Sequence, residues 1–230
     1  MNGLFVDLIP LLLGATLAPI YPIILFLLLQ SERGLGKAIG FVAGSVAVRL
    51  VQGVLFGLVF GPAVDAETAA GFELLGPTLL TVLGVLLLVM SVKKWRKGSD
   101  DEDGATPPGW MSALTEMNTL KAAGGGALLI LLSVKQWVFT LAAISVIQEA
   151  QPGTTAGIGL YLLFTLATQL LVLPPILAFA IAPQKSAAPL RTAQGWLQRH
   201  NRVIVVAVSL VFGAFFLLRG LTGLLAFRVV

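Results

Sequence analysis

The sequence predicts an all-α integral membrane protein with six transmembrane helices. Of its 230 residues, 57% are hydrophobic and only 11% are charged, and the mean hydropathy is +0.94. Soluble domains carry about 25% charged residues, so this composition excludes an ordinary globular domain. The chain has no cysteine and a single histidine, His200. We therefore expect no disulfide, no clustered metal site and no cofactor.

Six apolar runs are long enough to cross a hydrocarbon layer about 30 Å thick. They cover residues 4–29, 38–60, 74–92, 122–147, 156–181 and 203–225. We expect three parts: a first three-helix repeat over residues 1–92, a cytoplasmic linker over residues 93–121, and a second three-helix repeat over residues 122–230.

The first run is interrupted by Pro19 and Pro22, with Tyr21 between them. A proline lacks an amide donor and clashes with the preceding turn, so the helix must kink or unwind here. Unwound backbone at mid-membrane depth occurs where it lines a cavity or is buried in protein. Both a simple kink and a break that lines a cavity are consistent with this segment.

The second run carries Arg49 and Gln52 near its middle. Its glycines have four-residue spacings, at Gly40 and Gly44 and again at Gly53, Gly57 and Gly61. This spacing lets helix backbones approach closely, within one chain or between the two copies of a homodimer. Arg49 cannot lose its proton to escape burial. It therefore needs an anion, a water-filled cavity, or backbone carbonyls freed by the break in the first run.

The linker over residues 93–121 contains a basic block, an acidic block and a proline pair. We expect it to be flexible, because such charge blocks do not form a packed core. Within it, the apolar residues of 110–120 repeat at helical spacing and predict a short surface helix. These residues are Trp110, Met111, Leu114, Met117 and Leu120.

Lys135 lies in the fourth run, which opens on a glycine triplet at residues 124–126. A helix rises about 1.5 Å per residue, so Lys135 falls roughly 16 Å into the run, near mid-membrane. A charge there costs at least about 2.5–3.5 kcal/mol, so it should face a cavity or a partner. The alternative is that the lysine snorkels towards the membrane surface, or that the span is shifted along the sequence.

The last two runs add one further bend and one candidate ion pair. The fifth run follows a Pro152-Gly153 turn and contains Gln169 and a proline pair at residues 174 and 175, where the helix must bend. We expect residues 182–202 to form a basic loop between the fifth and sixth runs. In the sixth run, Arg219 lies near the same membrane level as Asp7, and we expect these two side chains to form a structural pair.

The basic residues gather on one side of the six-span plan. They are Arg33, Lys37, Lys93, Lys94, Arg96, Lys97, Lys121, Lys185, Arg191, Arg199 and Arg202. The other side carries Arg228, with Arg219 at its edge. The positive-inside rule then places the loops 30–37, 93–121 and 182–202 in the cytoplasm and both termini outside. The positive charge thus indicates membrane orientation, and we expect no nucleic-acid partner.

The two halves have opposed topologies, which is the inverted-repeat plan of many secondary transporters. Laying the second half on the first aligns Pro19 with Ser133, Tyr21 with Lys135 and Pro22 with Gln136. We therefore expect the first and fourth spans to cross near the membrane centre, with the Pro19–Pro22 turn close to Lys135.

The chain resembles the six-span GAP-type proteins, also called sulfolipid-addressing or glycopeptidolipid-addressing proteins, of the LysE-like exporter superfamily. The resemblance is carried by residues 17–24, by Trp110, Met111 and Leu114, and by residues 133–143. In the fourth span the family usually reads Asn-Pro-Lys-Asn, of which only Lys135 is kept. The resemblance implies a multi-pass protein of the bacterial plasma membrane that exports an envelope lipid or glycolipid; the superfamily implies export of small solutes such as amino acids.

The spans contain cations and amides at mid-depth but no carboxylate, which favours a site for an anionic group. We expect the site to be lined by Lys135, Arg49, Gln52, Pro19, Tyr21, Pro22, Ser133, Gln136 and Gln169. Its occupant would be an anionic lipid or a small anionic solute. The spans show no nucleophile with a partnering base, so we expect no enzyme. A scaffold within a larger lipid-export machine stays open as the alternative to transport.

Overall fold

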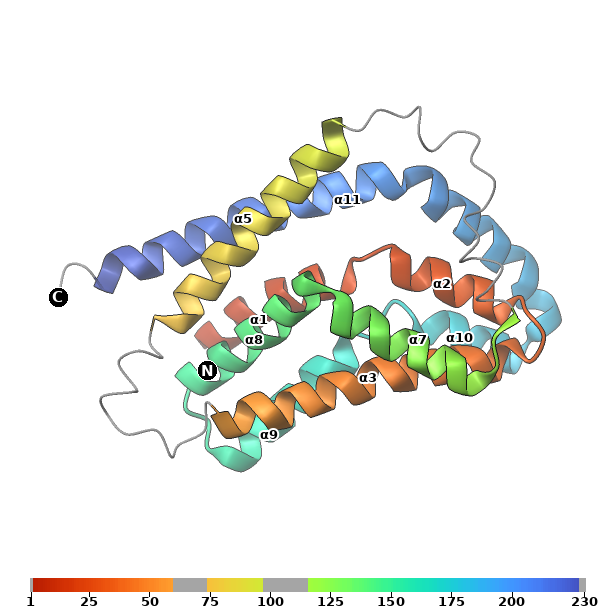
Figure 1. The fold of residues 1–230 in the computed structure, drawn as a ribbon, viewed down its shortest axis with the longest axis horizontal. Helices are drawn as coiled ribbons and strands as arrows, with labels where there is room; N and C mark the ends of the chain where they lie inside the picture. Colours follow the sequence, from red (N-terminus) through yellow and green to blue (C-terminus); the bar gives the residue numbers. More distant parts are fainter. Residues whose placement is uncertain (1, 60–73, 97–115, 228–230) are drawn as a thin grey trace.

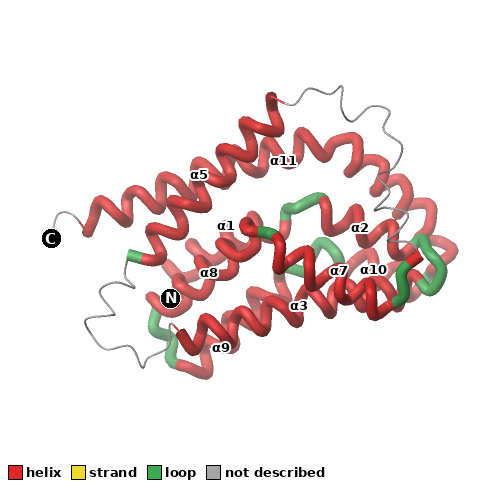
Figure 2. Tube along the Cα trace, viewed as in Figure 1, coloured by secondary structure: helices red, strands yellow, loops and turns green. Residues whose placement is uncertain are grey.

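The described chain is built almost entirely of helices (Figures 1 and 2). The computed structural model describes residues 2–59, 74–96 and 116–227, and within these ranges it contains no strand. Three of the helices are long and apolar enough to cross a membrane unbroken. They are α3 (Gly34–Val59), α5 (Leu75–Arg96) and α11 (Pro183–Phe227).

Two further candidate spans are bent helix pairs. Helices α1 (Asn2–Thr16) and α2 (Ile20–Leu29) meet at 50°, and α7 (Thr119–Leu132) and α8 (Val134–Glu149) meet at 74°. With each pair counted as one span, the described residues hold up to five. The fifth predicted span is divided between α9 (Thr154–Ala167) and α10 (Leu173–Ile181), each shorter than a membrane crossing.

Prolines account for two of these breaks. Pro19 immediately precedes α2 and Pro22 lies in its first turn. Pro174 and Pro175 likewise lie in the first turn of α10, after a turn over residues 168–172. A helix can start at a proline, because the amides of its first turn have no partner within the helix, but it cannot easily pass through one. Both predicted bends are confirmed.

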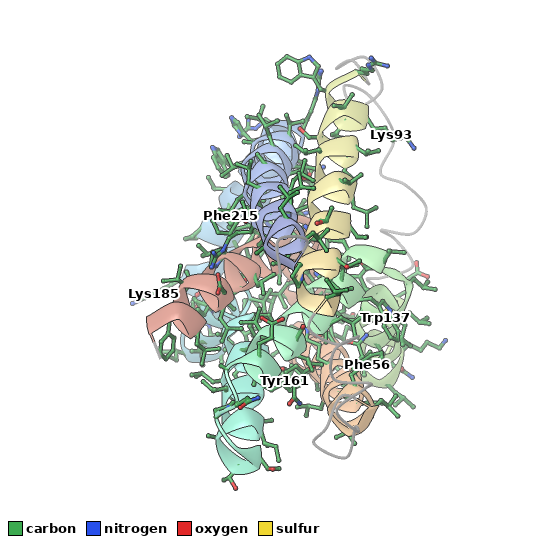
Figure 3. All side chains as sticks on the ribbon, turned by 90° about the vertical axis from the view of Figure 1, so that its left-hand side faces the viewer. Phe56, Lys93, Trp137, Tyr161, Lys185 and Phe215 are labelled. Carbon is green, nitrogen blue, oxygen red and sulfur yellow. The ribbon has the colours of Figure 1, made fainter. Side chains whose placement is uncertain are left out.

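The break between α7 and α8 contains no proline, whereas the sequence alone presents residues 122–147 as one run. Ser133 separates the two helices with extended backbone angles, φ −88° and ψ 97°. The indole N–H of Trp137 donates a 2.8 Å hydrogen bond to the carbonyl of Leu131, an acceptor at the end of α7. The Trp137 ring also meets Phe56 of α3 edge-on at 5.8 Å (Figure 3). Side-chain contacts thus stabilise this break.

Helix α11 corrects the predicted loop over residues 182–202, because this segment is helical from Pro183 onward. Leu190, Ala193 and Leu197 recur at helical spacing and pack into a core cluster with residues of α2 and α10. A helix of 45 residues is about 68 Å long, more than twice the hydrocarbon thickness. Figure 1 shows α11 curving at its N-terminal end, around the end of the bundle where α2 and α10 lie.

Close helix packing divides the bundle into two sides (Figure 1). On one side α5 and α11 pack together, and Gly84 faces the backbone of Leu217. On the other side α3 packs on α7, where Gly44 faces the carbonyl of Ala123. The predicted role of the small-residue spacing in helix packing is therefore confirmed at Gly40, Gly44 and Gly53, whereas nothing in the described chain lies within 4 Å of a methyl group at Gly57, and Gly61 lies outside the described residues. The homodimer through the same helix stays a prediction.

The main hydrophobic core joins α1, α5, α8 and α11 around the edge-on pair Phe139 and Phe216, whose ring centres are 5.8 Å apart. This core fixes the position of α8 relative to α1, so it also positions the residues just after the Ser133 break. At the far end of the same helices, Arg219 donates hydrogen bonds to Asp7, one of them 3.1 Å long. The predicted pair is confirmed.

The predicted surface helix over residues 110–120 falls mostly outside the described residues. Helix α7 begins at Thr119, and the side chain of Asn118 accepts a hydrogen bond of 2.8 Å from the amide of Lys121. Leu120 is therefore the second residue of a membrane helix and not the end of a separate surface helix.

Candidate functional site

The breaks in three helix pairs meet around the side chain of Arg49. Arg49 Nη2 donates a 2.7 Å hydrogen bond to Gln136 Oε1, and Nη1 donates a longer one of 3.4 Å to Thr140 Oγ1. Gln136 Nε2 in turn contacts the carbonyl of Ala15 at 3.4 Å, in the last turn of α1. Gln169, from the turn before α10, lines the same small cavity as Arg49. One arginine therefore lies where α1, α8 and the α9–α10 turn come together.

Arg49 is almost fully buried, with 3% of its surface exposed. Its Nε has no hydrogen-bond partner among the described residues. The four carboxylates in the described part of the chain are Asp7, Glu32, Glu116 and Glu149, and none forms an ion pair with it. The backbone carbonyl of Arg49 accepts a 2.6 Å hydrogen bond from Tyr161 of α9. The backbone of Arg49 is thus fixed to α9, while its charge has no balancing anion in the described structure.

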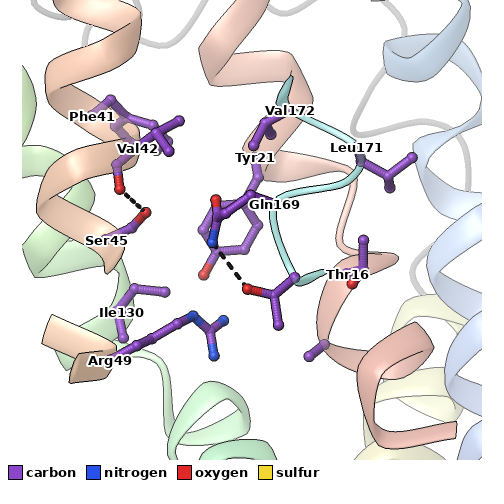
Figure 4. Close-up of a pocket in the computed structure, with 12 residues that line it drawn as sticks. Thr16, Tyr21, Phe41, Val42, Ser45, Arg49, Ile130, Gln169, Leu171 and Val172 are labelled. Atoms are coloured by element: carbon purple, nitrogen blue, oxygen red, sulfur yellow. Dashed lines mark hydrogen bonds between the residues drawn. The ribbon is translucent and has the colours of Figure 1, made fainter. Parts of the chain in front are cut away.

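A small cavity of about 20 Å³ lies beside Arg49, and we call it the arginine cavity. Figure 4 shows Arg49 entering it from one side, with Tyr21, Gln169 and Thr16 on the others. The remaining lining residues are Ala15, Phe41, Val42, Ser45, Ile130, Thr168, Leu171 and Val172. This volume holds about one water-sized occupant.

A larger cavity of about 220 Å³ lies on the other side of Tyr21 and Gln136, and we call it the lysine cavity. Lys135 lines it, together with Ser133 at the α7–α8 break and the residues 17–20 at the α1–α2 break. Met90 of α5 and four residues of α11 complete the wall: Asn201, Val205, Val208 and Ser209. Both breaks therefore line one cavity, as expected for the Pro19–Pro22 turn and Lys135.

Lys135 is half-buried, and its ammonium lies 5.6 Å from the centre of the Phe139 ring. Among the described residues it has no carboxylate and no hydrogen-bond partner. The amides of Gln136 and Trp137 both donate to the carbonyl of Ser133, whereas those of Val134 and Lys135 have no backbone acceptor in the described chain. Free amides at a helix N-terminus carry partial positive charge and favour anions. The lysine cavity is therefore cationic at this wall.

The sequence predicts that Arg49 and Lys135 line one cavity. In the structure they line two adjacent cavities. Tyr21 lines both, and Gln136 lines the lysine cavity while its amide oxygen accepts a hydrogen bond from Arg49. Gln136 therefore holds the guanidinium by this hydrogen bond and is itself part of the wall of the lysine cavity. The amide of Gln136 explains the separation, and the sequence offers no signal for it beyond the position of Gln136 beside Lys135.

The other predicted site residues are distributed over both cavities. Pro19, Tyr21 and Ser133 line the lysine cavity, and Gln169 lines the arginine cavity. Gln52 is 2% exposed, lines neither cavity, and has no hydrogen-bond partner for its amide among the described residues. Pro22 is buried within α2 and also lines neither.

Sequence reasoning missed the contribution of α11 to the lysine cavity. Asn201 falls in the segment expected to be a basic loop, and Ser209 is a single small polar residue in an apolar run. A helical reading of residues 183–202 would have placed Asn201 and Ser209 two turns apart on one face. Within the described residues there is no group of three or more histidine or acidic side chains that could hold a metal ion.

Comparison with known proteins identifies the family. The family described as Sap, sulfolipid-1-addressing protein, matches residues 8–222, nearly the full chain. No curated protein and no solved structure matches this chain. The matched range includes all three helix breaks and both cations that line the cavities. The chain belongs to the family of Sap, the sulfolipid-1-addressing protein.

Proposed function

We propose that this protein is a transporter that moves an anionic envelope lipid or glycolipid precursor across the bacterial plasma membrane. The acidic head group binds in the lysine cavity, at Lys135 and the N-terminus of α8. The observation that carries the proposal is that Lys135, whose ammonium has no ion-pair or hydrogen-bond partner among the described residues, lines a cavity of about 220 Å³ at the breaks of two helices. The family description, which names a sulfolipid, supports an anionic lipid as the substrate class.

The chemistry of the cavity wall supports an anionic ligand. A desolvated cation is stable only when water, a dipole or an anion compensates it, and the Phe139 ring supplies only a weak cation–π contact. The hydroxyl of Ser133 and the amide of Gln136 lie on the same wall. A sulfate, phosphate or carboxylate group can accept hydrogen bonds from such donors and from the ammonium together.

The size of the lysine cavity supports a head group rather than a whole lipid. One water takes up about 30 Å³ in the liquid, so about 220 Å³ holds roughly seven waters, or one sugar or acidic head group. The acyl chains must then remain outside. Residues of α5, α7, α8 and α11 line the cavity. Helix α5 packs on α8 and α11, and α7 packs on α3 and α8, so α5 and α7 are not close neighbours of each other. This leaves the side between α7 and α5 as the path for the chains towards lipid.

We also propose that the fold is a six-span protein with two inverted repeats and both termini outside. In this arrangement α9 and α10 form the fifth span together. Two features support the repeat: each half begins with a bent helix pair, and α5 and α11, the last helices of the two halves, pack on each other.

A small-solute exporter is the second candidate, because a cavity of about 220 Å³ would also enclose an amino acid or small organic anion completely. A non-transporting scaffold of a lipid-export machine is the third. It would have no need for an unpaired lysine that faces a cavity, since such a charge destabilises the fold.

The three candidates are separated by substrate selectivity of the full chain in proteoliposomes. We expect translocation of fluorescent lipids with sulfate or phosphate head groups, little translocation of zwitterionic lipids, and no uptake of labelled amino acids. Amino-acid uptake without lipid translocation would replace the proposal by small-solute export. Activity towards none of these substrates would favour the scaffold.

A further inference from the structure

Arg49 is a buried fixed charge whose compensation is incomplete. Its guanidinium makes one short and one long hydrogen bond to uncharged side chains, and its Nε–H is buried without an acceptor in the described chain. A neutral acceptor such as Gln136 satisfies a hydrogen bond but supplies no opposite charge. Burial of an arginine without an anion is costly, so a counter-ion is expected near it.

The arginine cavity provides the space for such a counter-ion. It lies against the Arg49 side chain, which is aimed into it, and holds one particle about the size of a water molecule (Figure 4). Sulfate, phosphate and carboxylate groups have several heavy atoms and exceed this size. A lipid head group therefore belongs in the lysine cavity, on the other side of Tyr21 and Gln136.

The donors available to an ion in the arginine cavity belong to Arg49, Gln169 and Tyr21, because the lining hydroxyls of Thr16, Ser45 and Thr168 have already used their hydrogens. Thr168 Oγ1 and Ser45 Oγ already donate to the backbone carbonyls of Thr165 and Val42. Gln169 Nε2 donates one hydrogen to Thr168 and keeps a second. Figure 4 shows the Tyr21 hydroxyl and the Gln169 amide on the side that faces Arg49. A spherical anion accepts hydrogen bonds from any direction and so suits a site whose donors come from α2, from α3 and from the α9–α10 turn.

We propose that the arginine cavity binds one small monoatomic anion, of the size of chloride, as the counter-ion of Arg49. The site is distinct from the lysine cavity and does not depend on what the protein transports. The bound ion compensates the guanidinium and thereby stabilises the junction of α1, α3, α8 and the α9–α10 turn.

The test compares the thermal unfolding of the purified full chain in sodium chloride and in sodium gluconate at equal ionic strength. We expect the Tm to rise by about 4 °C in chloride, the shift that follows when an ion binds only the folded state. Arg49→Met should abolish this rise. Lys135→Met is the matched control, since it removes the half-buried cation of the lysine cavity and leaves the arginine cavity intact, and it should keep the rise.

Three results would overturn the proposal: equal Tm values in both salts for Lys135→Met as well as for the parent, a chloride effect that persists in Arg49→Met, or one that Lys135→Met removes. Since Arg49→Met could fail to fold, crystals of the parent protein grown in sodium bromide give a second test. An anomalous bromide peak in the arginine cavity supports the site. Crystals that bind bromide only elsewhere, or not at all, would show that the cavity holds water.

Discussion

The guanidinium of Arg49 on α3 donates a 2.7 Å hydrogen bond to the side-chain oxygen of Gln136 on α8. The two residues belong to different halves of the chain and are both almost fully buried. The other end of the same amide contacts the carbonyl of Ala15, where α1 ends. Gln136 therefore links the Arg49 side chain to the broken first span, and it separates Arg49 from the lysine cavity.

Replacing this amide tests the link directly. Gln136→Leu leaves one Arg49 donor and the Ala15 carbonyl without their partner, so it should lower the free energy of unfolding by about 1–3 kcal/mol. Gln136→Glu keeps the acceptor and adds a negative charge, so it should remain near the parent stability. Thermal unfolding of both variants in detergent measures the difference. If Gln136→Leu were as stable as the parent, the hydrogen bond between Arg49 and Gln136 would not contribute to the stability of the fold.

The second prediction compares two glycines of α3, one closely packed and one not. A methyl group at Gly44 would meet the backbone carbonyl of Ala123, which cannot move without displacing α7. Gly44→Ala should therefore destabilise the fold by about 1–3 kcal/mol. Gly57→Ala is the matched control, because nothing in the described chain lies within 4 Å of its new methyl group and alanine favours helix. Equal yields and Tm values for both variants would refute the close α3–α7 contact.

The Asp7–Arg219 pair should contribute little to stability. Both side chains are substantially exposed, and such ion pairs are worth about 0.2–1 kcal/mol. A double-mutant cycle with Asp7→Asn and Arg219→Gln should give a coupling within that range, and 0.5 M salt should reduce it. A coupling energy well above about 1 kcal/mol would contradict this prediction and would mean that the Asp7–Arg219 pair is shielded from water in the membrane-embedded protein.

The orientation can be tested because the chain has no cysteine of its own. A cysteine placed at Gly98, in the segment between α5 and α7, should be protected from an impermeant thiol reagent in intact cells. A cysteine added after Val230 should be labelled. This follows from the basic residues on the cytoplasmic side. Labelling of position 98 from outside would reverse the topology.

Much of the fold could be predicted from local sequence. Pro19, Pro22 and the pair at residues 174 and 175 locate two breaks, because a missing amide acts on the residue's own turn. The break at Ser133 could not be predicted in the same way. It depends on the indole of Trp137 and its contact with Phe56, which is distant in sequence. The helix over residues 183–202 was not predicted, because the basic residues of this segment suggest a loop and only a few apolar residues recur at helical spacing.

The site shows the same division between local and tertiary information. The depth of Lys135 in an apolar run predicts that it faces a cavity, and it does. The partner of Arg49 could not be predicted, because Gln136 lies far along the chain and reaches Arg49 only after both spans have packed. For that reason the sequence predicts one cationic cavity where the structure has two.

The most direct test of head-group binding at Lys135 is the translocation rate of a fluorescent anionic lipid by the Lys135→Met protein in proteoliposomes. Methionine keeps most of the volume and removes the charge that the head group needs. Lys121→Met is the control, since Lys121 is exposed near the start of α7, outside both cavities. We expect Lys135→Met to fold but to lose about tenfold or more of the rate, as removal of a desolvated charge partner does, and Lys121→Met to keep it. A Lys135→Met protein that moves the anionic lipid as fast as the parent would contradict head-group binding at Lys135.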